Sequence, residues 1–179
     1  SRASAGGEWI EVRTPHFSVV TNTDERRGRE LALRFEQMRG VFGTLLVRTR
    51  VNLPVPLQIV AFENSSDFHR FVPFWRGKPV EVSGLFQPGE DRDFIVLDLS
   101  SNESVPAVFH EYAHVLLAGN YPHTQPWFDE GFAEYFSTIR ISAKEVEVGR
   151  PPASAPLLAG ATLLPVTELF AVGRDSKIY

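Results

Sequence analysis

The sequence has no cysteine, a single methionine and only three lysines in 179 residues. Without cysteine the chain can build neither a disulfide framework nor a thiolate metal site, and it has no cysteine nucleophile. It also lacks any run of about 18 or more apolar residues, the length that a transmembrane helix needs. These absences do not identify the cellular compartment. They are compatible with an extracytoplasmic or membrane-associated location of the full-length protein.

The overall composition is that of an ordinary globular domain, with 43% hydrophobic and 22% charged residues. We expect a short flexible segment at 1–7, followed by a single domain at 8–179 that can be part of a longer protein. The formal net charge of −4 argues against a nucleic-acid partner.

The stretch from 104 to 117 predicts one helix. Ser104 is a suitable N-cap, Pro106 suits the first turn, and Gly119-Asn120 supplies a stop. Apolar residues recur at three- and four-residue steps, which predicts that most of this helix is buried. These residues are Val108, Phe109, Tyr112, Val115 and Leu116.

Three polar side chains interrupt this buried helix: His110, Glu111 and His114. Because His110 and His114 are four positions apart, they lie on one face and can reach a single metal ion. Glu111 is about 100° further round the helix, where it would face a water held by the metal. This is the H-E-x-x-H pattern of zinc metalloproteases, and roughly 0.01 chance matches are expected at this composition. The alternative is a helix with two core histidines and one surface glutamate.

A second helix, predicted at 127–136, offers a third metal ligand. Glu130 and Glu134 share one face of it, while Asp129 is rotated away. Gly131 is unfavourable inside a helix, and we expect it to permit a close approach to the first helix that brings Glu130 to the metal. Glu134, one turn further, could hold a ligand histidine by its other nitrogen.

The segments His110-Glu111-Tyr112-Ala113-His114 and 127–135 together resemble the gluzincin group of metallopeptidases. The resemblance is strongest to bacterial peptidase-MA-like domains and more distant to thermolysin-like and aminopeptidase N-like enzymes. It implies an α+β, zincin-like fold, with a small mixed β-sheet packed against helices. It also implies that one Zn²⁺ is bound by His110, His114 and Glu130, that Glu111 is the general base, and that Glu134 supports a ligand histidine. The G-x-M-E-N segment of the aminopeptidases is absent, which disfavours an exopeptidase.

The remaining patterns predict the scaffold. We expect strands at 8–13, 16–21, 54–62, 81–87 and 93–99, helices at 25–46, 64–72 and 165–170, a hairpin over 137–149 and a loop at 151–156. The strand at 93–99 is apolar nearly throughout, which indicates a central position in the sheet.

Two surfaces of this scaffold carry specific expectations. In the resembled enzymes an edge strand pairs with the substrate backbone, and Gly84 to Gln87 is the candidate here, although an ordinary structural hairpin is an equal alternative. On the long helix we expect a buried face and a solvated arginine face. The expected buried residues are Leu31, Leu33, Phe35, Met38, Val41, Phe42 and Leu45, and the arginines are Arg26, Arg27, Arg29, Arg34 and Arg39.

The predicted function is hydrolysis of peptide bonds, as an endopeptidase, with Zn²⁺ as cofactor and a peptide or protein as substrate. Candidates for stabilising the oxyanion are Tyr179, His123 and Tyr135. Two alternatives remain: a catalytically silent peptidase-like domain that binds a partner peptide, and a purely structural zinc site. The lack of cysteine and the presence of Glu111 weigh against the structural site.

Overall fold

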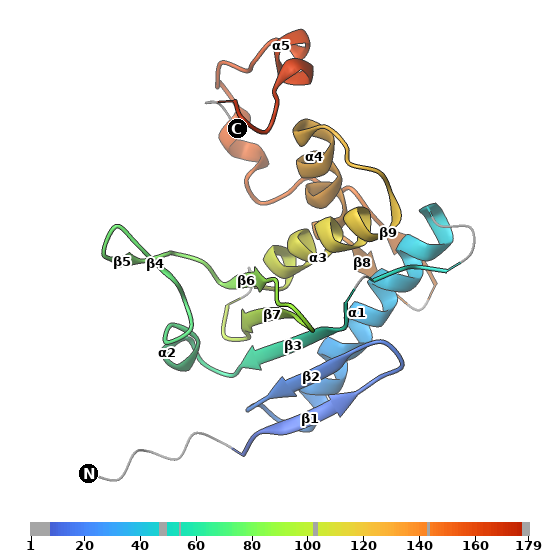
Figure 1. The fold of residues 1–179 in the computed structure, drawn as a ribbon, viewed down its shortest axis with the longest axis vertical. Helices are drawn as coiled ribbons and strands as arrows, with labels where there is room; N and C mark the ends of the chain where they lie inside the picture. Colours follow the sequence, from blue (N-terminus) through green and yellow to red (C-terminus); the bar gives the residue numbers. More distant parts are fainter. Residues whose placement is uncertain (1–7, 47–49, 54, 102–103, 143, 177–179) are drawn as a thin grey trace.

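The computed structural model describes residues 8–46, 50–53, 55–101, 104–142 and 144–176, and it has a mixed α+β architecture (Figure 1). The segment 1–7, expected to be flexible, lies outside the described residues. The main sheet has five strands, in the spatial order β1 (Ile10–Arg13), β2 (Ser18–Thr21), β3 (Leu57–Phe62), β7 (Asp93–Asp98) and β6 (Gly84–Gln87). The helices are α1 (Glu25–Leu46), α2 (Ser65–Phe68), α3 (Ser104–Asn120), α4 (Pro126–Ser137) and α5 (Val166–Ala171), with a 3₁₀ turn at Ala155–Leu158. Two small hairpins are formed by β4 (Phe74–Trp75) with β5 (Lys78–Pro79) and by β8 (Arg140–Ile141) with β9 (Val146–Glu147).

The sheet is mixed. β1 and β2 are antiparallel, β2, β3 and β7 are parallel, and β6 returns antiparallel to β7. β7 therefore lies inside the sheet, between β3 and the edge strand β6, in agreement with its apolar sequence. Gly84 of β6 pairs with Leu97 of β7, and Gln87 pairs with Phe94.

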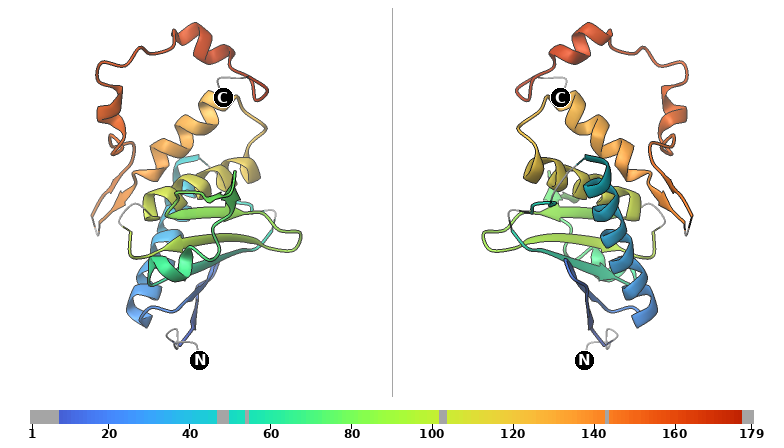
Figure 2. Two further views of the ribbon diagram at one scale, coloured as in Figure 1. Left: turned by 90° about the vertical axis from the view of Figure 1, so that its left-hand side faces the viewer. Right: turned by 90° about the vertical axis from the view of Figure 1, so that its right-hand side faces the viewer.

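Side chains alternate between the two faces of the sheet, as strand geometry requires. Ile59 and Ile95 point into the main core beneath α1 and α3, whereas Val60 and Val96 point to a smaller cluster on the other face. Figure 2 shows α1 and α3 on one side of the sheet and α2 on the other.

Aromatic rings join the helices within the main core. Phe35 of α1 contacts both Phe109 and Tyr112 of α3, with ring centroids 5.2 and 5.4 Å apart. Phe42 of α1 contacts Phe136 of α4 at 6.2 Å. Because aromatic pairs add to the free energy gained from burial, this cluster fixes α3 and α4 against α1.

The long helix differs from its prediction at three positions. Leu33 and Leu45 are 55% and 61% exposed, and Arg39 is buried. Leu33 lies about 200° round the helix from Leu31, on the solvent side, and Leu45 lies in the last turn. Arg39 shares the buried face and donates from Nη2 to the Val51 carbonyl at 2.8 Å, which satisfies part of its guanidinium.

The C-terminal segment, defined as residues 150–176, lies beyond α4, at the opposite end of the molecule from β1 (Figure 1). It exposes many large apolar side chains. They are Leu157, Leu158, Leu163, Leu164, Val166, Leu169 and Phe170. Among the described residues no helix combines the length and apolarity that crossing a bilayer demands.

Candidate metal centre

Helix α3 carries a buried face and a polar face. Val108, Tyr112 and Leu116 are fully buried in the core, while His110 and His114 lie on the opposite, partly exposed side. Ser104 is the first helical residue rather than the predicted N-cap, and its hydroxyl donates to the Ser101 carbonyl at 2.7 Å. The core side of the helix therefore fixes the direction in which the histidines point.

Helix α4 packs along α3 and begins at Pro126, one residue before its predicted start. Gly131 does not provide the predicted close approach, because a Cβ placed there would meet nothing within 4 Å. The tight contact involves Gly84 on β6, where a Cβ would lie 2.4 Å from Cγ1 of Val108. Ala133 is the fully buried residue of α4, and its small side chain suits close packing of helices.

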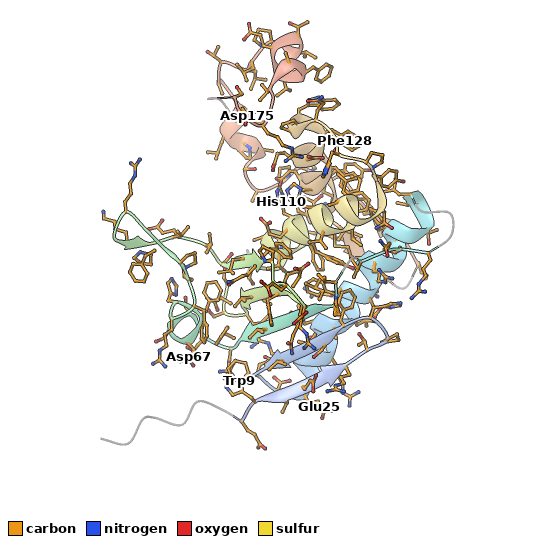
Figure 3. All side chains as sticks on the ribbon, viewed as in Figure 1. Trp9, Glu25, Asp67, His110, Phe128 and Asp175 are labelled. Carbon is orange, nitrogen blue, oxygen red and sulfur yellow. The ribbon has the colours of Figure 1, made fainter. Side chains whose placement is uncertain are left out.

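The two helices bring His110, His114 and Glu130 together. The distances are 3.2 Å between the two histidine Nε2 atoms, 3.3 Å from His110 Nε2 to Glu130 Oε2, and 3.6 Å from His114 Nε2 to the same oxygen. One ligand atom from each residue lies within 4.8 Å of the other two. Figure 3 shows the labelled His110 side chain where α3 faces α4.

These distances match the spacing of donor atoms around a small cation. A circle through the three atoms has a radius of about 2 Å, close to the Zn–N and Zn–O bond lengths of about 2.0–2.2 Å. Three lone-pair donors that converge this closely repel one another unless a proton or a cation lies between them. The donor set of two imidazoles and one carboxylate therefore fits a metal ion.

Glu134 contacts the opposite nitrogen of His110. Its Oε2 lies 3.3 Å from His110 Nδ1. The tautomer of His110 that carries its proton on Nδ1 would donate it to this carboxylate and leave the lone pair of Nε2 directed at Glu130 and His114. Glu134 is thus placed where it could orient the imidazole ring.

Two hollows meet at Glu111. The first, the β6 groove, has a volume of about 650 Å³ and runs between Gly84, His110, Glu111 and the loop 150–154. The second, the α4 hollow, has a volume of about 420 Å³ and is lined by Glu111, His114 and Glu130 among others. The residues of the His–His–Glu cluster line these two hollows, His110 the first and His114 and Glu130 the second.

The three residues considered for stabilising an oxyanion have different positions. His123 lines the α4 hollow together with His114. Tyr135 lines neither hollow, and its ring packs against Gly149, where a Cβ would be only 2.0 Å away. Tyr179 lies outside the described residues.

One feature near the site could not be found from sequence. Asp129, expected to face away, is largely buried and accepts hydrogen bonds from Thr124 Oγ1 and from the guanidinium of Arg174. Arg174 lies 45 positions away along the chain and lines the α4 hollow. No local pattern links two residues so far apart.

No family model matches the chain, and none of the curated proteins matches it. Its class is therefore defined by its own fold and site: an α+β protein with a mixed five-stranded sheet and a His–His–Glu cluster that could hold a metal ion.

Proposed function

We propose that this protein is a zinc-dependent peptidase of the gluzincin type, with a zincin-like fold. The observation that carries the proposal is the convergence of His110, His114 and Glu130 to distances of 3.2–3.6 Å, with the H-E-x-x-H residue Glu111 beside them. Glu134, behind His110, adds the supporting carboxylate that metal-binding histidines commonly have.

The proposed metal is a single Zn²⁺ held by His110, His114 and Glu130. Two histidines and one glutamate, with a position left for solvent, form a common catalytic zinc site. Zinc bound there would act as a Lewis acid, polarising the scissile carbonyl and making a water acidic enough to attack it at neutral pH.

Glu111 is proposed as the general base. It accepts a proton from the attacking water and then donates it to the departing amine, so that water is added across the peptide bond. Its position between the β6 groove and the α4 hollow supports this role, because substrate on either side of the cleaved bond passes it.

The proposed substrate is a peptide or protein segment in extended conformation. β6 is an edge of the sheet, and its Gly84 lines the same groove as His110 and Glu111. An extended peptide can add to such an edge through main-chain hydrogen bonds, which places its backbone along the groove.

The decisive experiment measures bound metal and peptide turnover on the same protein. We expect about one zinc per chain and cleavage of a mixed peptide library that stops when the metal is removed by a chelator. Glu111→Gln is expected to keep zinc and to lower turnover by at least about 10²-fold. Glu130→Ala is expected to lose zinc, because it removes a ligand.

A matched control is Glu8→Gln, an exposed residue that makes no ion pair within the described part of the chain and should leave both readouts unchanged. Full turnover in Glu111→Gln would contradict the base assignment. Unchanged zinc in Glu130→Ala would mean that another group is the third ligand. One bound zinc per chain without cleavage of any peptide would contradict the peptidase proposal and favour a domain that only binds peptides. A bound iron would point to a different 2-His-1-carboxylate chemistry.

A further inference from the structure

A third cavity, with a volume of about 680 Å³, lies beside the first turn of α3, between α1 and β8. Arg27 and Arg34 of α1 and Arg140 of β8 line it, and we call it the arginine pocket. Glu30 is the one carboxylate among its described lining residues. The pocket is therefore positive in a protein whose net charge is −4.

The guanidinium groups of the arginine pocket have N–H donors that can bind a ligand. Arg27 uses Nη2 to reach the Leu99 carbonyl at 2.9 Å, which holds the side chain in place and leaves its other N–H groups available. Within the described residues, Arg34 and Arg140 form no ion pair. Glu30, at the rim, is bonded to Arg26 at 3.3 Å. Planar guanidinium groups with free donors match the geometry of a carboxylate.

The arginine pocket lies next to the β6 groove. Pro106, Ser137 and Arg140 line both cavities, so these residues lie at their common border. Pro106 precedes His110 by one helical turn, about 6 Å, and Ser104 precedes it by about 9 Å. An extended peptide advances about 3.3 Å per residue, so a residue two or three positions from the one beside His110 reaches the pocket.

We propose that the arginine pocket is a remote subsite that binds an aspartate or glutamate side chain of the peptide substrate, two or three residues from the cleaved bond, on the side that occupies the β6 groove. The inference rests on the proposed peptidase function and adds a substrate class to it: peptides with an acidic residue at that distance. Arg34 and Arg140 supply the free donors, and Arg27 supplies a fixed positive charge.

The test uses peptide pairs that differ only by Glu against Gln at one position, scanned along both sides of the cleaved bond. We expect kcat/KM to favour the Glu peptide on the order of ten-fold at one position, the size of a single charge-assisted hydrogen bond. The preference should shrink at high salt. It should disappear in Arg34→Gln/Arg140→Gln and persist in Arg29→Gln, a control on the same helix outside the pocket.

A binding measurement separates this inference from the proposed function. Fluorescein-labelled Glu and Gln peptides are titrated against zinc-loaded Glu111→Gln, with and without the two arginine substitutions. Tighter binding of the Glu peptide that depends on the two arginines supports the subsite. If the wild type then cleaves no peptide, only the proposed peptidase activity is overturned. Cleavage with equal kcat/KM for both peptides, or a preference unchanged in the double variant, overturns the subsite and leaves the peptidase standing.

Discussion

The body of the molecule, up to β8, and the C-terminal segment 150–176 differ in how far they bury their apolar side chains. The body buries a cluster of aromatic and aliphatic residues, including Phe35, Phe42 and Tyr112, between α1, α3, α4 and the sheet. The segment leaves Leu157 79% exposed and Phe170 51% exposed. Side-chain contacts join the segment to α4. Arg174 forms an ion pair with Asp129, and the ring of Phe170 packs on that of Trp127, with 4.5 Å between centroids. The His–His–Glu cluster lies on α3 and α4, within the body, and the packing of these helices in the core holds its three residues together.

The largest expected effect is a loss of stability when a core side chain of the body is shortened. Leu116→Ala removes a fully buried side chain of α3 and should lower the free energy of unfolding by about 2–5 kcal/mol. Leu157→Ala, the same change in the exposed segment, should alter it by less than about 0.5 kcal/mol. Urea unfolding of both variants measures the contrast. Equal losses would mean that the segment carries part of the core.

The next effect concerns two glycines. Gly84→Ala should cost about 1–3 kcal/mol, because its Cβ would meet Cγ1 of Val108 at 2.4 Å and push β6 from α3. Gly131→Ala should stabilise the protein by up to about 1 kcal/mol, because it adds helix propensity where nothing is close. Thermal melts compare the two. Adding Val108→Ala to Gly84→Ala should relieve the steric part, and a double variant no better than expected from additivity would refute the clash.

A smaller effect tests how the segment is attached. Arg174→Ala should change the free energy of unfolding by only about 1 kcal/mol, since Arg174 itself is more than half exposed. It should nevertheless speed amide hydrogen exchange in α5, because a main anchor to Asp129 is lost. Arg70→Ala, a surface arginine paired with Asp67 on α2, serves as the control. Unchanged exchange in α5 would show that the ring contact alone holds it.

The smallest effect is a pH dependence located in the body. Burial raises the pKa of Glu36, but hydrogen bonds from Thr14 and from the ring and backbone N–H of His16 outweigh it and bring the pKa below its usual 4.5. The ionised form therefore stabilises the native state above pH 4.5, and this contribution is lost as the pH falls through the lowered native value.

Chemical unfolding across this range should show the stability gap between the wild type and Glu36→Gln closing as the pH falls. Glu168→Gln, on the exposed α5, should give a gap that stays constant. A Glu36 gap that stayed constant as well would contradict the hydrogen-bonded arrangement.

The sequence predicted most of the secondary structure and the grouping of His110, His114, Glu130 and Glu134, because these features follow from local spacing. The four side chains lie on two consecutive helices, and helical periodicity alone puts each pair on one face. The predicted bounds of α1, α4 and β7 agree with the structure to within one residue for the same reason. β6 begins at Gly84, three residues after its predicted start, and α2 ends at Phe68, four residues before its predicted end.

Features set by tertiary packing were not predictable in this way. Periodicity could not tell which glycine meets a neighbour, so Gly131 was assigned the close contact that Gly84 makes. Arg39 was expected on the solvated face, but it is buried, and its Nη2 donates to the Val51 carbonyl in the chain after α1. The arginine pocket lies between α1 and β8, which are more than 100 positions apart in the sequence. No local sequence pattern predicts that these two elements lie close together.

The order of the chain has a consequence for biosynthesis. All five strands of the main sheet precede His110, and Glu130 follows His110 by only 20 positions. Synthesis from the N-terminus therefore completes the sheet strands before His110, His114 or Glu130 leaves the ribosome. The closing of such a short loop then costs little entropy. The cluster is thus assembled last, by a hairpin of two helices that packs on strands synthesised before it.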